Sequence, residues 1–242
     1  MDMNAIILCA GYGNRLRPLT NTCPKCLIEV AGKLVLEWIF DRLRAAGIRH
    51  VAVNILRSFS ALSLPTFKSM SIQYWSDAWP QGTAASVNIM MCDRPQAVVC
   101  YGDVLWDWNL QDMLTFHEEV DGDDHVTVAL HRSTKPWNCG VATLGEEHRI
   151  IHFIEKPEPR DCESQWVNAG VMAISKSATY LIPKAVQRPD IAQNWLPTLI
   201  RSGYPVYGYL LPKSSMVIDI GTPKNLAHAR DVWASVQRPS SL

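Results

Sequence analysis

Apolar residues in the first half of the chain fall into short continuous runs, separated by segments in which apolar positions recur every three or four residues. The runs predict strands over 6–10, 50–55, 71–76 and 97–101, and the helical spacing predicts helices over 35–46 and 82–91. Because strand and helix alternate at this spacing, we expect parallel strands in an open, three-layer sheet.

The pattern changes after residue 108, where the apolar runs become hairpin-like. It predicts a helix over 109–120, strands over 126–131, 140–144, 150–155 and 170–175, and a polar loop over 157–165. Thr222-Pro223 is typical of a helix start, here of a final helix ending near residue 236. The prediction is a Rossmann-like α/β (αβα) fold with a mostly parallel mixed sheet and a smaller mixed β region. Segment 56–68 receives no predicted element.

Composition is that of a globular chain with a hydrophobic core: 48% of the 242 residues are hydrophobic and 19% charged. Lys plus Arg and Asp plus Glu both number 23, which argues against nucleic acid as a partner. No apolar run is long enough for a membrane span, and no secretory signal is recognisable, so we expect a cytoplasmic protein without a membrane partner. Seven irregularly spaced cysteines agree with a reducing compartment.

The first predicted strand leads directly into a glycine-spaced turn that carries basic residues. Glycines allow backbone N–H groups to approach an anion closely, and Arg offers a planar fork for phosphate oxygens. Arg15 and Lys25 supply the positive charge. The stretch therefore predicts a polyphosphate site, with the nucleotide held by Leu8, Ala10, Gly11, Gly13 and Asn14.

Two familiar phosphate loops do not fit this turn. The dinucleotide fingerprint requires a third glycine where this chain has Leu16, which disfavours a nicotinamide-dependent oxidoreductase. The Gly-Lys-Ser/Thr ending of the P-loop is absent as well.

The chain resembles the sugar-1-phosphate nucleotidyltransferases, whose signature Gly-x-Gly-x-Arg-Leu-x-Pro-Leu-Thr, then Pro-Lys, is present between Gly11 and Lys25. The resemblance extends from about residue 4 to 229. Further motifs of that family follow in the same order: Gly82-Thr83-Ala84, Gly102-Asp103, Glu155-Lys156-Pro157, Asn168-Ala169-Gly170 and Asp219-x-Gly221-Thr222. It implies one nucleotidyltransferase domain over 1–236, with a nucleotide-binding half (1–108), a sugar-binding half with a closing helix (109–236) and a tail (237–242).

The resemblance implies that an NTP and a sugar 1-phosphate react to an NDP-sugar and pyrophosphate. Arg15 and Lys25 would be catalytic, and Asp103 and Asp219 would hold Mg²⁺. From the residues alone, Asp103 is better explained as a turn aspartate after glycine. Asp219, inside an apolar strand, is equally a capping or salt-bridged carboxylate.

The same resemblance implies that Glu155, Asn168 and Gly140 read the sugar and that Lys156 contacts its phosphate. Cys139 replaces an aromatic residue of the family pattern, a departure that bears on the sugar pocket.

The nucleobase would lie beside Gly82 and Thr83. Asp77, five residues earlier, could accept hydrogen bonds from guanine N1–H and its amino group, which favours GTP. Gln81 departs from the leucine of the family motif. Residues 101–104, 194–197 and 219–223 are most similar to guanylyltransferases acting on mannose 1-phosphate or D-glycero-D-manno-heptose 1-phosphate, whose products feed surface polysaccharide or glycoprotein synthesis.

Two alternative functions stay open. Uridylyl, thymidylyl or cytidylyl transfer to another phosphorylated sugar or alcohol would use the same motifs. A non-catalytic paralogue that binds an NDP-sugar and regulates a partner should have lost some of Arg15, Lys25, Asp103 and Asp219, and all four are present. The sequence does not define the oligomeric state, and a homo-oligomer is left open as well.

Overall fold

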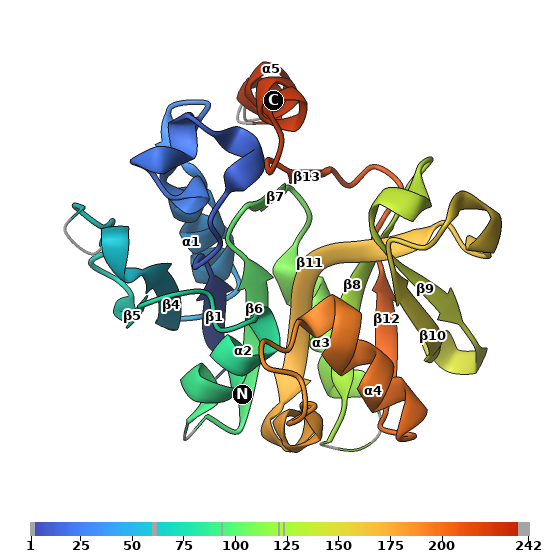
Figure 1. Ribbon diagram of the computed structural model, residues 1–242. Helices are drawn as coiled ribbons and strands as arrows, with labels where there is room; N and C mark the ends of the chain where they lie inside the picture. Colours follow the sequence, from blue (N-terminus) through green and yellow to red (C-terminus); the bar gives the residue numbers. More distant parts are fainter. Residues whose placement is uncertain (1–2, 60–61, 93, 121, 123, 237–242) are drawn as a thin grey trace.

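A mixed sheet organises the computed structural model, which describes residues 3–59, 62–92, 94–120, 122 and 124–236. Within these residues the sheet has nine strands in the order β10-β9-β11-β6-β1-β4-β5, with β8 paired to β11 and β12 to β8 (Figure 1). The strands are β1 Asn4–Leu8, β4 His50–Leu56, β5 Ser71–Asp77, β6 Gln96–Tyr101, β8 Val126–Arg132, β9 Gly140–Leu144, β10 Ile150–Glu155, β11 Trp166–Ser175 and β12 Val206–Leu210. Two short ribbons accompany it: β2 Glu29–Val30 with β3 Lys33–Leu34, and β7 Val104–Trp106 with β13 Val217–Asp219.

Strand direction changes across the sheet. Strands β5, β4, β1 and β6 are parallel, whereas β11 runs antiparallel to both β6 and β8. The predicted Rossmann-like α/β fold with a mixed sheet is thereby confirmed. The predicted smaller β region is a continuation of the same sheet, formed by the strands beyond β11.

Helices cover both faces of the sheet, because alternate strand residues point to opposite sides. Ile7 packs with α1 and α3 in one core cluster, whereas its neighbour Ile6 packs with α2 and α4 in another. The helices are α1 Val35–Ala45, α2 Thr83–Met91, α3 Leu110–Glu119, α4 Leu196–Arg201 and α5 Pro223–Val236, and a π-helical turn, Ile191–Trp195, precedes α4. The three layers of the prediction are thus observed (Figure 1).

Local signals at the helix ends agree with the sequence. Gly47 follows α1 with φ +78°, a conformation in which glycine avoids the strain of a Cβ, and its N–H donates to Arg44 O at 3.0 Å. At the start of α5, Thr222 Oγ1 accepts from Asn225 N at 3.2 Å, as expected of an N-cap residue.

Several elements differ from the sequence prediction. Strand β11 begins at Trp166, not at Gly170, because its first residues pair with the far end of β8 before the register shifts. Gly170 lies within that shift with φ +76°, so the chain bends there and continues as strand. The sequence pattern did not identify β12, whose centre is a glycine, or α4, which has only six residues.

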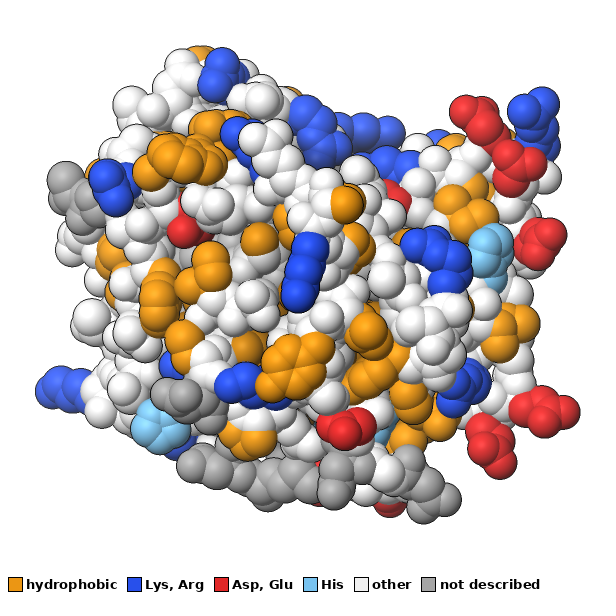
Figure 2. Space-filling view, turned by 60° about the horizontal axis from the view of Figure 1, so that its bottom comes forward, with side chains coloured by type: hydrophobic (Ala, Val, Ile, Leu, Met, Phe, Trp, Pro, Cys, Tyr) orange, Lys and Arg blue, Asp and Glu red, His pale blue; other side chains and the backbone are white. Residues whose placement is uncertain are grey.

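Within the described residues, no helix is both long enough and apolar enough to cross a bilayer. On the face drawn in Figure 2, the coloured basic side chains are scattered among apolar ones. The division into nucleotide-binding and sugar-binding halves stays a prediction, as do the cytoplasmic location and the homo-oligomer.

A buried histidine gives the fold a pH dependence. His117 on α3 is 2% exposed, its Nδ1 is hydrogen-bonded to Thr127 Oγ1 at 2.8 Å, and its ring lies 4.1 Å from that of His125 between centroids. Burial, and then the charge of His125, lower the pKa of His117 from 6.5 to about 4. The folded protein therefore holds this ring neutral at pH 7.

We expect the free energy of unfolding to fall as the pH drops from 6.5 to 4. In that window the unfolded chain binds a proton at this position and the folded chain does not, which costs about 3 kcal/mol. Urea unfolding at several pH values measures this loss. In His117→Asn the part due to this ring should disappear, so identical pH profiles for the two proteins would contradict the assignment.

Candidate active site

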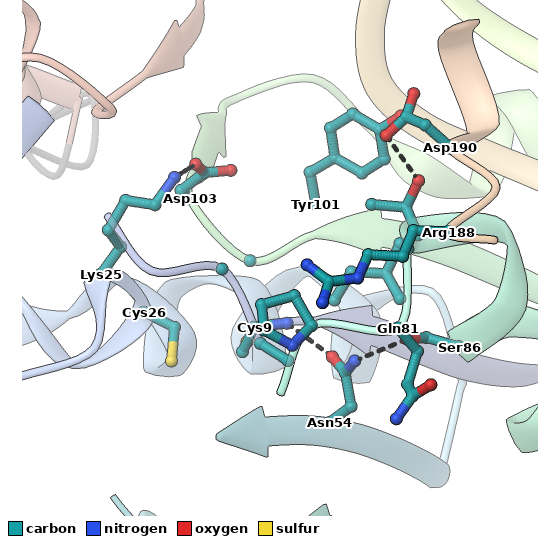
Figure 3. Close-up of a pocket in the computed structure, with 17 residues that line it drawn as sticks. Cys9, Lys25, Cys26, Asn54, Gln81, Ser86, Tyr101, Asp103, Arg188 and Asp190 are labelled. Atoms are coloured by element: carbon teal, nitrogen blue, oxygen red, sulfur yellow. Dashed lines mark hydrogen bonds and ion pairs between the residues drawn. The ribbon is translucent and has the colours of Figure 1, made fainter. Parts of the chain in front are cut away.

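A pocket opens where β1 and β6 end, at the edge of the sheet where open α/β folds bind ligands. Its volume is about 370 Å³. Figure 3 shows its lining side chains converging from several distant segments of the chain. Among the residues predicted from sequence, those that line it are Leu8, Ala10, Gly11, Lys25, Gly82, Thr83 and Asp103.

The turn after β1 is tightly packed. Gly13 has φ +65°, and a Cβ there would lie 2.8 Å from Thr20 Cγ2. Thr20 Oγ1 donates to Gly13 O at 2.8 Å, which holds the turn closed. Asn14 follows on the exposed side, at the start of the short 3₁₀ helix Asn14–Leu16 that carries Arg15. The predicted phosphate loop is therefore a tightly held turn, and the basic side chain of Arg15 follows directly after it.

Four charged residues from distant parts of the sequence come together beside this turn. Lys25 Nζ forms an ion pair with Asp103 Oδ2. Asp219 on β13 pairs with Val104 on β7, which places it next to Asp103, and Ile220 N donates to Asp103 O at 2.9 Å. The β7–β13 ribbon thus brings the two predicted carboxylates side by side.

Arg15 belongs to the same group. A Cβ at Gly221 would lie 2.9 Å from Arg15 Nη2 and 2.7 Å from Asp219 Oδ1, so the glycine leaves room for the guanidinium beside the carboxylate. Gly221 N also donates to Asp219 Oδ1 at 2.6 Å. The Asp-x-Gly element therefore orients its carboxylate and admits Arg15.

The electrostatics of this group suit a cation. Desolvation by the surrounding protein, and then the neighbouring Asp103 carboxylate, raise the pKa of Asp219. The backbone N–H of Gly221 and the charges of Lys25 and Arg15 lower it. Two adjacent carboxylates repel each other unless positive charge lies close to both. Proteins hold Mg²⁺ with one or two carboxylates, and substrate phosphates and water complete its octahedron, so this donor set fits a divalent metal.

The predicted sugar-binding residues form a neighbouring group. Lys156 Nζ lies 3.3 Å from Glu155 Oε1, and Lys156 N donates to Cys139 O at 2.9 Å with the lysine at φ +49°. Burial raises the pKa of Glu155, and the adjacent Lys156 lowers it. A Cβ at Gly140 would lie 2.8 Å from Glu155 Oε2, so this glycine makes room for the carboxylate.

Tyr101 connects this group to the pocket, which it lines. Burial, then the charges of Asp190, Glu155 and Asp103, raise the pKa of the Tyr101 hydroxyl, whereas a hydrogen bond with Asn168 lowers it. Asn168 Oδ1 also accepts from Gly170 N at 2.8 Å. Asn168 and Glu155 therefore lie close to Tyr101 at the edge of the pocket, although neither lines it.

Sequence reasoning did not identify several further residues that line the pocket, among them Asn54, Arg188 and Asp190. Asn54 on β4 is hydrogen-bonded to Asp77, the carboxylate predicted at the base. Arg188 points into the pocket (Figure 3), and Asp190 Oδ2 accepts from Thr83 Oγ1 at 2.9 Å. Asn54 could have been identified from the sequence, since it is a polar residue inside an apolar strand. No sequence pattern marks the segment with Arg188 and Asp190 as part of a site.

Comparison with known proteins agrees with this geometry. The family model for nucleotidyl transferases matches residues 4–235. The mannose-1-phosphate guanylyltransferase of Mycobacterium tuberculosis is 30% identical over 231 residues, which cover 93% of this chain and 62% of that protein. The mannose-1-phosphate guanylyltransferase catalytic subunit beta of Danio rerio is 30% identical over 234 residues, covering 92% and 62%. The chain thus spans about three fifths of the length of these relatives.

A comparison with solved structures tests the fold class. The crystal structure of a UDP-glucose pyrophosphorylase complexed with UDP-glucose superimposes with a TM-score of 0.83, at 17% identity, and covers 97% of this chain and 99% of that one. The likeness confirms the fold class. The family model, which spans nearly the whole sequence, shows that the chain belongs to the nucleotidyl transferase family, and with the relatives it confirms the resemblance to the sugar-1-phosphate nucleotidyltransferases.

Proposed function

We propose that this protein transfers a nucleotidyl group from an NTP to a sugar 1-phosphate, with release of pyrophosphate and with Mg²⁺ as cofactor. The observation that carries the proposal is the meeting of Arg15, Lys25, Asp103 and Asp219 beside a glycine turn at the strand ends. Two cations and two carboxylates at one place suit a reaction between two anions, which must be neutralised and aligned.

The chemistry requires no covalent intermediate. A phosphate oxygen of the sugar 1-phosphate attacks the α-phosphorus, a new P–O bond forms, and the bond to the bridging oxygen of pyrophosphate breaks. The attacking oxygen is already ionised at neutral pH, so no general base is needed. When bound, Mg²⁺ supplies charge neutralisation at the phosphates, held by Asp103 and Asp219.

Each remaining residue has a positional role in this proposal. Backbone N–H groups from Gly11 to Asn14 hold the triphosphate, and Arg15 stabilises charge on the departing pyrophosphate. Lys25 lies where it can exchange its partner Asp103 for a phosphate oxygen. Lys156 anchors the sugar phosphate for in-line attack, while Glu155, Asn168 and Gly140 face the sugar.

Within this reaction we assign GTP and a manno-type hexose or heptose 1-phosphate as substrates. The mannose-1-phosphate guanylyltransferases among the relatives support this choice. Asp77 also supports it, because its carboxylate accepts a hydrogen bond from Asn54, a residue that lines the pocket. A carboxylate there accepts from the adjacent N1–H and N2–H of guanine, whereas uracil presents one donor between two carbonyls.

Asp77→Ala should relax the choice of nucleotide. Loss of a paired hydrogen-bond acceptor for a base costs about 1–3 kcal/mol of discrimination, so the kcat/KM ratio of GTP over UTP should fall about 5- to 150-fold. Steady-state kinetics with each NTP measure the ratio. An unaltered ratio would remove Asp77 from base recognition.

The reverse reaction tests the proposed activity. Purified protein is incubated with radiolabelled pyrophosphate, Mg²⁺ and single NDP-sugars, and the label is followed into NTP. Incorporation with GDP-mannose or a GDP-heptose supports the proposal. If NDP-sugars bind but no label is incorporated, the regulatory alternative takes its place.

A further inference from the structure

A single buried amide, which lines the pocket together with Cys9 and Ser86, also reaches the end of β5 beside it. Asn54 is 3% exposed, and its Oδ1 accepts from Cys9 N at 2.7 Å. Its Nδ2 donates to Asp77 Oδ2 at 3.0 Å and to Ser86 Oγ at 3.0 Å (Figure 3). The phosphate loop, the end of β5 and helix α2 are thus linked through one side chain.

The chemistry of the partners fixes the orientation of this amide. Cys9 N–H can only donate and an ionised Asp77 carboxylate can only accept, so a reversed amide would place like atoms against each other at two contacts. Both N–H groups and the carbonyl oxygen of Asn54 are engaged. Asn54 is therefore locked in place and cannot turn toward a ligand without losing buried hydrogen bonds.

This locked amide constrains the Asp77 carboxylate, which lies directly behind the pocket-lining Asn54. Its Oδ2 is held by Asn54, and its Oδ1 makes no hydrogen bond with any residue that the structure describes. Desolvation raises the pKa of Asp77, and the hydrogen bond from Asn54 opposes that rise. The amide therefore both aims the carboxylate and favours its ionised form, the form that accepts from a base.

We propose that Asn54 is a positioning residue that sets nucleobase selectivity, by holding the Asp77 carboxylate toward the base and in register with the phosphate loop at Cys9. This inference rests on the proposed function and adds a residue to it. The selected ligand class is a nucleoside triphosphate whose base presents two adjacent donors, as guanine does.

Asn54→Asp is the most direct test, because the new side chain has nearly the same shape. It keeps an acceptor for Cys9 N–H, removes the donor to Asp77 and sets a second carboxylate against it. Calorimetry with GTP, UTP and ATP, in the absence of sugar phosphate, measures binding without turnover. We expect the preference for GTP over UTP to fall about tenfold or more, since hydrogen bonds to charged groups are worth about 1.5–3 kcal/mol.

Two further variants separate selectivity from general damage. Asn88→Asp makes the same change at an exposed position of α2 and should keep the wild-type preference. The double variant Asn54→Asp with Asp77→Asn restores an amide–carboxylate hydrogen bond in reverse. It should recover thermal stability and shift the preference away from guanine, toward bases that present one donor beside one acceptor, because an amide offers one of each.

The outcomes are distinguishable. A wild-type GTP/UTP preference in a folded Asn54→Asp protein would overturn this inference and leave the proposed function intact. If Asn54→Asp does not fold, Asn54→Ser repeats the measurement with a small, uncharged side chain, and an unchanged preference there would likewise overturn it. If the wild-type protein binds no NTP, the proposed function itself fails.

Discussion

Arg15→Ala should lower kcat by a factor on the order of 100 to 1,000 while the protein stays folded. The side chain is exposed and its guanidinium lies beside Gly221 and Asp219, so its removal leaves no cavity in the core. Loss of one fixed donor to charge that develops in a transition state typically costs this much. Stopped assays of pyrophosphate release, with circular dichroism to check folding, measure the effect.

A matched control comes from Arg201, an exposed arginine in the last turn of α4. Arg201→Ala removes the same charge away from the site and should leave kcat within about twofold, as is usual for surface substitutions. Arg15→Lys should recover only part of the activity, because an ammonium cannot reproduce the planar fork. Near-normal turnover of Arg15→Ala would exclude Arg15 from the mechanism.

Asp103→Asn should reduce metal-dependent turnover by at least about 100-fold, since even indirect support of a metal ligand is worth 10- to 100-fold. The substitution keeps the shape of the side chain but removes the charge that pairs with Lys25 and acts on Asp219. The Mg²⁺ concentration for half-maximal rate should rise. Direct titration of Mg²⁺ binding in the presence of GTP provides a readout that does not depend on turnover.

Asp231→Asn, at an exposed position of α5, is the control for this change. It should keep both the wild-type rate and the wild-type affinity for Mg²⁺. If Asp103→Asn binds Mg²⁺ as tightly as the wild-type protein, Asp103 is not a metal ligand, and its carboxylate serves only as the partner of Lys25.

The charged centre could be predicted from the sequence because its parts lie at the ends of predicted strands. Asp103 follows the strand that ends at Tyr101, and parallel strands bring their carboxyl ends to one edge of the sheet. The metal-ligand role of Asp219 was predicted from the resemblance to the family, whereas the cost of a carboxylate in an apolar strand indicated only that it needs a partner. The sequence patterns did not predict that β7 and β13 pair, and it is this pairing that places Asp219 beside Asp103.

The contribution of the second half of the chain to the nucleotide pocket was not predictable from local patterns. Arg188 reaches the pocket because the segment before the π-helical turn is attached to the start of α2. There Ala84 N donates to Pro189 O at 3.0 Å, and Thr83 Oγ1 donates to Asp190 while accepting from Ile191 N at 2.7 Å. These contacts join residues more than a hundred positions apart, and no short motif or periodicity encodes them.

The same attachment explains the glycine of the Gly-Thr-Ala motif. Gly82 has φ +96°, and a Cβ there would lie 2.5 Å from Pro189 O. The motif was predicted as a turn beside the nucleobase. In the fold it is also the place where the segment carrying Arg188 docks.

Pyrophosphate release, measured over a grid of ATP, GTP, CTP, UTP and dTTP against a panel of sugar 1-phosphates with and without Mg²⁺, tests the central claim most directly. We expect Mg²⁺-dependent release with GTP and a manno-type hexose or heptose 1-phosphate, and much slower release with the other pairs. If no pair releases pyrophosphate although calorimetry detects binding of an NDP-sugar, the claim that this site transfers a nucleotidyl group to a sugar 1-phosphate is contradicted.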